Sequence, residues 1–491
     1  MRVIYFFLLG IIVIGLTACG SNRSNVLHDT DIADAGFVHE YTAVLDTPTI
    51  CETDITPAPI ASEPPTITDF IRDLDYLLYV LQNNFANFDV AYIERGVDIT
   101  VLIHELQSLL LTKESIAFSE FYYMLTTVFR PLFNIAHFHI FQPHPNHPHL
   151  IPDIANENEY QPARTAQDYF DIFTTAHLPL LQHMFVSISM YYGEEKADEK
   201  WNAIQDGCID IFVSVIKSYN NMPNIFTRII DEDKVAYMAM RTMMPARNTT
   251  TTWHETTTAL RDFYYEIREY DHLIIDLRGN LGGSLGIFRD IVLNPLTPDG
   301  KSFTLETYFF TFLGEYAQRF LSSPLCNRSL ALAQHTFLID QELRPIADIL
   351  EESCLPELNM ANIQRMDYGF RVEYRYNLWA HPRFRDVYFR GNIWLLIDEY
   401  TGSAGHEAAW ISKESGFATL VGVPTGGNYG GTGVRATATL PNSRIMFQFD
   451  PFNVLDSRGR AMEAGILPHH FNRPGMGALA TTLALITEGQ Y

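Results

Sequence analysis

The segment around residue 400 constrains the architecture of this chain more than any other. Residues 393–398 form an apolar run typical of a buried strand, a short turn follows, and Ser403 precedes a helical pattern over 404–414. A strand that leads directly into a helix is the repeating unit of layered α/β domains. Ser403 should therefore lie at a helix N-terminus, where unpaired N–H groups favour a developing oxyanion. Serine is also a preferred helix cap, so this position alone predicts either a nucleophile or a cap.

Strand and helix patterns alternate on both sides of this segment. Together they predict an α/β domain over residues 226–491. We expect strands at 235–240, 273–277, 370–376, 419–423, 433–440 and 445–449, and helices at 256–270, from 283 through 293, at 314–323 and at 328–352.

The residues before 226 do not show this alternation of strand and helix patterns. Apolar residues recur at spacings of three and four from residue 67, again through 102–110, and from 118 to 131, so residues 66–142 predict a small helical N-terminal domain. It closes in an alternating run at 134–141. Residues 143–225 are an insert of unknown type, with prolines at its start and no recognisable PDZ carboxylate loop.

The first 65 residues have the composition of a targeting segment and a linker. Arg2 is followed by an apolar run at 3–16, which is shorter than the ~20 residues that a spanning helix needs. The run ends in Leu16-Thr17-Ala18-Cys19, which resembles a bacterial lipobox. The resemblance implies a lipoprotein signal peptide at 1–18, a lipid on Cys19 and a place on the extracytoplasmic face of the cell membrane. Residues 19–65, rich in Ser, Thr, Pro and Asp, are expected to be a flexible tether.

Charge and cysteine usage exclude some classes of partner. A net charge of −24 over 491 residues argues against binding to nucleic acid. The cysteines have no CxxC spacing and no histidine partners at zinc-site spacing, so we expect no structural zinc site. Chemistry based on serine and histidine side chains would also require no metal and no organic cofactor. Cys326 and Cys354 flank one segment and are able to pair in an oxidising compartment, which the sequence alone does not decide.

Two blocks carry a family resemblance. Residues 276–283 (DLRGNLGG), and 401–407 (TGSAGHE) followed by 418–427 (ATLVGVPTGG), resemble the S41 family of serine peptidases, which includes the C-terminal processing proteases and the tricorn core protease. The resemblance implies a catalytic domain with a fold like ClpP and crotonase, and Ser403 as the nucleophile. It also implies an oxyanion site made by the amide of Ala404 and one amide from Gly282 or Gly283.

The general base separates two branches of that family. One branch uses a lysine where this chain has Asn428, which is not basic, and Lys413 stands about 15 Å from Ser403 along the expected helix. The other branch uses a histidine from the helical domain and a glutamate near the end of the core. By motif position these are His137 and Glu463.

Three further residues, close in sequence to His137 or Ser403, carry side chains that are able to act as acids or bases. His139 competes with His137, because both side chains would point to one face of an extended segment. His406 and Glu407, on the helix after Ser403, are interpreted as structural residues.

The sequence therefore predicts a lipid-anchored serine endopeptidase, in which Ser403 attacks the peptide bond, His137 moves the proton and Glu463 orients His137. Its partners would be a peptide or protein substrate and, through the lipid, the membrane. A ligand-binding lipoprotein without catalytic activity, and an esterase with the same triad, are the alternatives.

Overall fold

The computed structural model describes residues 64–132, 135–141, 178–244, 253–312, 314, 315, 318, 337–339, 343–379, 381–429 and 435–490. The predicted signal peptide, Cys19 and nearly all of the predicted tether lie outside these residues, as does most of the helix predicted at 314–323.

A six-stranded sheet forms the centre of the C-terminal half. Its order is β14-β10-β9-β4-β3-β2, in which β2 pairs antiparallel and every other pair is parallel. The strands are β2 (Ile225–Asp231), β3 (Val235–Met240), β4 (His272–Asp276), β9 (Asn392–Ile397), β10 (Thr419–Gly422) and β14 (His470–Phe471).

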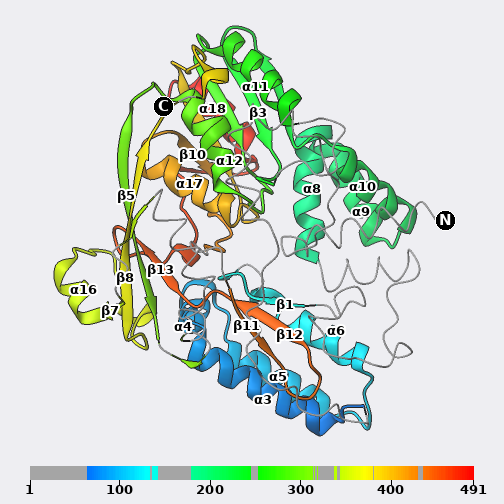
Figure 1. The fold of residues 1–491 in the computed structure, drawn as a ribbon. Coiled ribbons are helices and arrows are strands. Elements are labelled where there is room, and N and C mark those ends of the chain that lie inside the picture. Colours follow the sequence, from blue (N-terminus) through cyan, green and yellow to red (C-terminus); the bar gives the residue numbers. More distant parts are fainter. Residues whose placement is uncertain are drawn as a thin grey trace, which may run out of the picture.

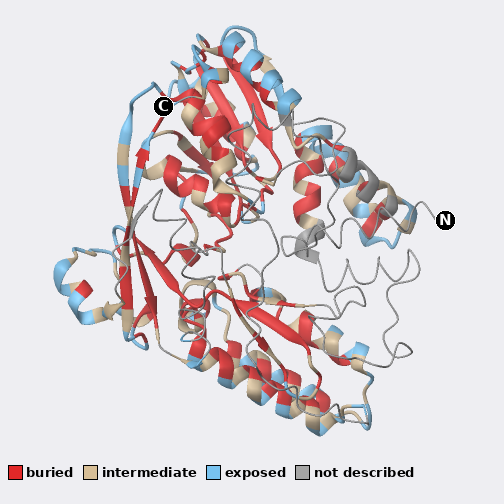
Figure 2. Cartoon of the chain, viewed as in Figure 1, coloured by how far each residue is buried: buried red, intermediate tan, exposed pale blue. Residues whose placement is uncertain are grey.

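Helices cover both faces of this sheet (Figure 1). On one face lie α11 (Trp253–Ile267), α12 (Leu285–Phe288) and α17 (Ala404–Glu414); on the other lie α8 (Leu178–Tyr192) and α18 (Ala478–Thr487). The central strands are consequently buried on both sides, as the red ribbons in Figure 2 show. This explains why β3, β4 and β9 are continuous apolar runs and not alternating ones.

A second, antiparallel sheet lies beside the first and has the order β13-β5-β8-β6, with β7 also paired to β8. Its strands are β5 (Ser302–Thr311), β6 (Phe337–Ile339), β7 (Arg344–Pro345), β8 (Tyr368–Asn377) and β13 (Asn453–Asp456). The helix predicted at 328–352 is wrong in the first part of its described range, where β6 and β7 lie, and is confirmed at its end, where α16 (Ile346–Glu352) forms. Pairing to β8 overrides the local helical pattern there.

The N-terminal helices share a core with a distant hairpin. They are α3 (Ile67–Asn84), α4 (Phe88–Arg95), α5 (Ile99–Leu111) and α6 (Phe118–Val128), and they pack on a sheet of order β1-β12-β11. This sheet joins β1 (His139–Ile140) to β11 (Ala436–Thr439) and β12 (Met446–Phe449), which lie about 300 residues later in the chain. The predicted fold class, α/β with a helical N-terminal domain, is confirmed.

The described part of the predicted insert consists of three helices: α8, α9 (Glu194–Gln205) and α10 (Ile209–Asn221). The domain boundaries themselves stay predictions. Cys208 and Cys354 are exposed and carry no disulfide, whereas Cys326 lies outside the described residues. Within the described ranges, no helix combines the length and apolarity that crossing a membrane requires.

Candidate active site

Ser403 stands on a strained turn between β9 and α17. Its backbone has φ of 52° and ψ of −125°, a region that non-glycine residues rarely occupy. Its N–H donates to the carbonyl of Gly427 over 3.0 Å, while its side chain makes no capping hydrogen bond to α17. The capping interpretation is therefore wrong for this serine. A serine held on a sharp strand-to-helix turn presents its hydroxyl outward, as nucleophilic serines do in other α/β enzymes.

His137 faces that hydroxyl. Its Nε2 lies 3.1 Å from Ser403 Oγ, and its side chain is 14% exposed. The residue lies in the turn before β1, where Ala136 and His137 both have positive φ. The amide side chain of Asn428 fixes this turn, because its Oδ1 accepts the His137 N–H over 2.9 Å.

Asp450, directly after β12, binds the other ring nitrogen of His137. The distance from His137 Nδ1 to Asp450 Oδ2 is 2.5 Å, and the Asp450 side chain is buried. The Asp450 N–H also donates to the carbonyl of Ala136. A carboxylate only accepts hydrogen bonds, so Nδ1 carries the proton and Nε2 of the neutral ring is left to accept from Ser403. Burial and the charge of Arg435 lower the pKa of His137 below its usual 6.5, against the opposing effect of Asp450.

Glu463 does not contact the His137 ring, although the sequence predicted that it would orient this histidine. It lies in the short 3₁₀ helix Met462–Ala464, is buried, and its carboxylate accepts the N–H groups of Asn428 and Tyr429, each over 2.9 Å. Ala136 contributes another backbone hydrogen bond to it. No hydrogen bond joins Glu463 to the His137 ring among the described residues. Burial raises the pKa of Glu463 to about 7, although the N–H groups of Asn428 and Ala136 and the charge of Arg95 oppose that change.

The register of the β1–β12 pair in the structure explains the position of Asp450. In the β1–β12 pair His139 is opposite Gln448 and Ile140 is opposite Phe447. Continuing this antiparallel register by two residues places 137 beside 450. The sequence predicted both segments as extended but not their pairing, and therefore missed Asp450.

His139 has a separate environment. It lies in β1, and its ring packs edge-on against Phe141 with centroids 5.3 Å apart. Because His137 is in a turn and not in an extended strand, the expectation that both rings share a face does not apply. The structure brings His137 to Ser403.

Two other basic side chains near Ser403 in sequence have structural partners. Lys413 Nζ donates to the carbonyl of Leu467, at the far end of α17. His406 is buried, with Nδ1 at 2.7 Å from Thr425 Oγ1, and burial lowers its pKa to about 3. Both residues match their interpretation as non-catalytic groups.

The glycine-rich turn 279–283 lies directly against Ser403. Asn280 joins the two turns, since its carbonyl accepts the Gly402 N–H and its Oδ1 accepts the Gly282 N–H. A Cβ on Gly282 would lie 2.7 Å from both Ala404 N and Ser403 Cβ, so only glycine fits there. The Gly282 amide is thus occupied. The amides of Ala404 and Gly283 have no acceptor within the described part of the chain.

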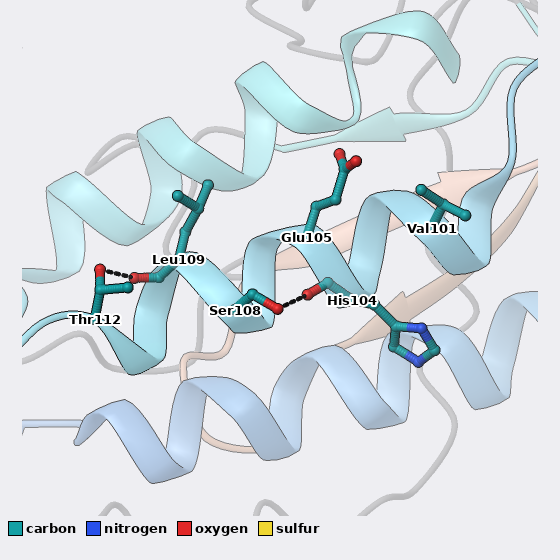
Figure 3. Close-up of a pocket in the computed structure, with 6 residues that line it drawn as sticks. All are labelled: Val101, His104, Glu105, Ser108, Leu109 and Thr112. Carbon is teal, nitrogen blue, oxygen red and sulfur yellow. Dashed lines mark hydrogen bonds between the residues drawn. The ribbon is translucent and has the colours of Figure 1, made fainter.

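Other features of the described surface do not extend this site. No group of three or more His, Cys, Asp or Glu side chains is placed to hold a metal in the described ranges. An open groove runs along α5 (Figure 3), and it shares no residue with the Ser403 site. Its lining residues are Val101, His104, Glu105, Ser108, Leu109 and Thr112.

The fold and the site together define an α/β protein in which a serine on a strand–turn–helix faces a histidine–aspartate pair. Residues 234–470 match the model of peptidase family S41. The matched segment contains both blocks, 276–283 and 401–427, that resemble that family. No curated protein matches the chain in sequence.

Solved structures with a similar arrangement include three examples. A candidate peptidase from Parabacteroides merdae is 13% identical, with a TM-score of 0.44 over 86% of this chain and 97% of its own. Mature CPAF is 12% identical, with a TM-score of 0.44 over 82% and 92%. A lipoprotein from Streptococcus agalactiae is 12% identical, with a TM-score of 0.35 over 88% and 99%.

Proposed function

We propose that this protein is a serine endopeptidase of the S41 type, in which Ser403, His137 and Asp450 act as the catalytic triad. The observation that carries the proposal is the continuous hydrogen-bond chain from Ser403 Oγ through both ring nitrogens of His137 to Asp450. The family match over residues 234–470 supports a peptidase. Asp450 replaces Glu463 in the orienting role that the sequence predicted.

Each residue has a defined task in this mechanism. Ser403 Oγ attacks the peptide carbonyl while His137 Nε2 takes its proton and later gives it to the leaving amine. Asp450 holds Nδ1–H and stabilises the imidazolium that forms. Because burial lowers the pKa of His137, the ring is neutral at pH 7 and ready to act as a base. The amides of Ala404 and Gly283 are the proposed donors to the oxyanion.

A ligand-binding lipoprotein on the same fold would not need this chain of hydrogen bonds. Strained backbone at Ala136, His137 and Ser403 costs free energy, on the order of 1–3 kcal/mol per residue, and such strain persists where a precise geometry is needed. This favours an active nucleophile. A serine–histidine–carboxylate triad serves the hydrolysis of both amides and esters, so both substrate classes belong in the test.

The deciding experiment combines a fluorophosphonate probe with hydrolysis of peptide and ester reporters. We expect the probe to label the native protein at Ser403, and Ser403→Ala and His137→Ala each to lower kcat by a factor on the order of 10⁴. The matched control is His139→Ala, which should stay within about tenfold of the native protein. Labelling that persists in Ser403→Ala would refute the mechanism, and turnover of esters alone would favour the esterase.

We also propose that the mature protein is anchored by a lipid on Cys19, outside the cytoplasm. The support is the Leu16-Thr17-Ala18-Cys19 sequence after a short apolar run. Replacing Cys19 by Ala should release the protein from the membrane fraction or block its processing. Membrane fractionation and mass spectrometry measure this, and an unchanged mass and location would contradict the anchor.

A further inference from the structure

We propose that Asn280 is a positioning residue, which engages the Gly282 N–H and leaves the Gly283 N–H as the donor to the oxyanion. Thr242 assists it by holding the Gly282 carbonyl. The inference rests on the proposed peptidase function, because an oxyanion forms only if Ser403 attacks a carbonyl group. It goes beyond that function by assigning two residues outside the triad. The sequence left open whether Gly282 or Gly283 supplies the second amide.

Asn280 joins three segments of the chain. It is fully buried, and both polar atoms of its side chain bind the main chain. Its Nδ2 donates to the carbonyl of Met240, at the end of β3, over 2.9 Å, and its Oδ1 accepts the Gly282 N–H over 2.8 Å. Its carbonyl accepts the Gly402 N–H, in the turn before Ser403, over 2.9 Å. One residue thus fixes β3, the glycine-rich turn and the nucleophile turn relative to one another.

The carbonyl of Gly282 is held from the other side. It accepts the Met243 N–H over 2.8 Å and the Thr242 hydroxyl over 3.0 Å. Met243 and Gly283 form a parallel bridge, in which the Met243 carbonyl also accepts the Ser284 N–H over 2.7 Å. In a planar trans peptide, the N–H of one residue points opposite to the carbonyl of the residue before it. The Gly283 N–H is therefore directed away from residues 242–243.

The nucleophile turn packs against the same peptide. A Cβ on Gly282 would lie 2.7 Å from both Ala404 N and Ser403 Cβ, so the two turns are in direct contact there. A shift of the glycine-rich turn would consequently displace the Gly283 N–H relative to the Ser403 hydroxyl and the Ala404 N–H. The bonds of Asn280 oppose such a shift, and therefore keep the two proposed donors in a fixed relation.

The chemistry shows which step depends on this relation. When Ser403 Oγ bonds to the carbonyl carbon, His137 Nε2 takes the hydroxyl proton and the π electron pair of the carbonyl moves to its oxygen. The full negative charge exists on that oxygen only in the tetrahedral intermediate and near it in the transition state. A misdirected donor should therefore lower kcat more than it weakens substrate binding.

Steady-state kinetics on the peptide reporter provide the first test. Asn280→Ala should lower kcat by a factor on the order of 10², with KM within about threefold of the native value. Thr242→Val removes the hydroxyl with little change of volume and should lower kcat about tenfold, whereas Thr242→Ser keeps the donor and should stay within about twofold. The Thr242 pair keeps the inference testable if Asn280→Ala does not fold.

Asn453→Ala is the matched control. Asn453 is also fully buried, and its Nδ2 donates to a main-chain carbonyl, that of Asn362, over 3.2 Å. It lies in β13 of the second sheet, so its loss should lower the melting temperature but leave kcat within about twofold of the native value.

The second test compares binding of two inhibitors built on the peptide reporter. In one, a trifluoromethyl ketone replaces the cleaved amide and adds reversibly to Ser403 to give a tetrahedral oxyanion; in the other, a secondary alcohol at the same place is unable to add. We expect Asn280→Ala to weaken binding of the ketone by a factor on the order of 10² and binding of the alcohol by less than about threefold. The acid limb of the pH profile should not move, because the His137–Asp450 pair is untouched.

The outcomes separate this inference from the proposed function. An unchanged kcat and an unchanged preference for the ketone in Asn280→Ala and Thr242→Val would overturn the inference and leave the peptidase intact. An equal loss of alcohol and ketone binding, or a Thr242→Ser variant as slow as Thr242→Val, would reduce both residues to a structural role and also overturn it. A native protein that neither cleaves the reporter nor prefers the ketone would overturn the peptidase itself, and the oxyanion assignment with it.

Discussion

His137 is held by a hydrogen bond from its backbone N–H to Asn428 and by contacts of its two ring nitrogens with Asp450 and Ser403. The two carboxylates near this residue have different partners, so we expect their substitutions to have different effects. Asp450 binds the ring, whereas Glu463 binds the backbone of the segments around it. We expect Asp450→Asn to lower kcat by a factor on the order of 10⁴, because an amide allows the wrong tautomer of His137. Glu463→Gln should mainly lower the melting temperature, since its NH₂ group would face backbone N–H donors. Parallel kinetics and thermal unfolding measure both, and the reverse pattern would restore Glu463 as the orienting residue.

The pH dependence of activity follows from the lowered pKa of His137. The base works when neutral, so kcat/KM should be fully developed above the pKa of the free enzyme and lost as the pH falls through it. Burial and Arg435 lower that pKa below 6.5, which places the midpoint of the acid limb below 6.5. Arg435→Gln should move the midpoint upward by removing a positive charge. Steady-state kinetics from pH 4.5 to 9 measure this, and activity that still rises through pH 9 would indicate a lysine base.

Among the elements, the turns at the ends of β4 and β9 pack directly against each other. Gly282 has φ of 97°, and an added Cβ would lie 2.7 Å from Ala404 N and Ser403 Cβ. Gly282→Ala should therefore abolish turnover by displacing the start of α17. Gly475→Ala is the matched control, because Gly475 also has positive φ but nothing within 4 Å of the added Cβ. Activity and melting temperature of both variants separate steric displacement from backbone strain, and an active Gly282→Ala would contradict this account of the turn.

The whole molecule is joined by a core that combines the first helices with the last hairpin. Asp73 of α3 is buried and accepts the backbone N–H groups of Asn442 and Ser443, over 2.8 and 2.7 Å. Asp73→Ala should lower the free energy of unfolding by roughly 2–4 kcal/mol, since it leaves both donors unpaired. Asp75→Ala, on the exposed side of the same helix, should cost less than about 1 kcal/mol. Denaturant unfolding measures both, and equal costs would mean that the hairpin does not depend on α3.

The sequence by itself determined the strands and helices whose patterns are strong and local. Residues 235–240 are β3 as predicted, and 404–414 are α17, because continuous apolar runs and helical periodicity depend on near neighbours. Motif position also selected Ser403 and His137, which the structure brings within 3.1 Å. The sequence pattern did not predict β5 (Ser302–Thr311). This strand is stabilised by pairing with β8 and β13, both of which are distant in sequence.

Tertiary structure alone decided which carboxylate serves His137. A motif places Glu463 near the site but does not say whether its oxygens meet a ring nitrogen or backbone N–H groups. The pairing of β1 with β12, which are far apart in sequence, brings Asp450 to Nδ1. The long Glu463 side chain instead holds the segments around His137 and Asn428. Contacts of this kind depend on strand register and loop geometry, which local sequence patterns do not encode.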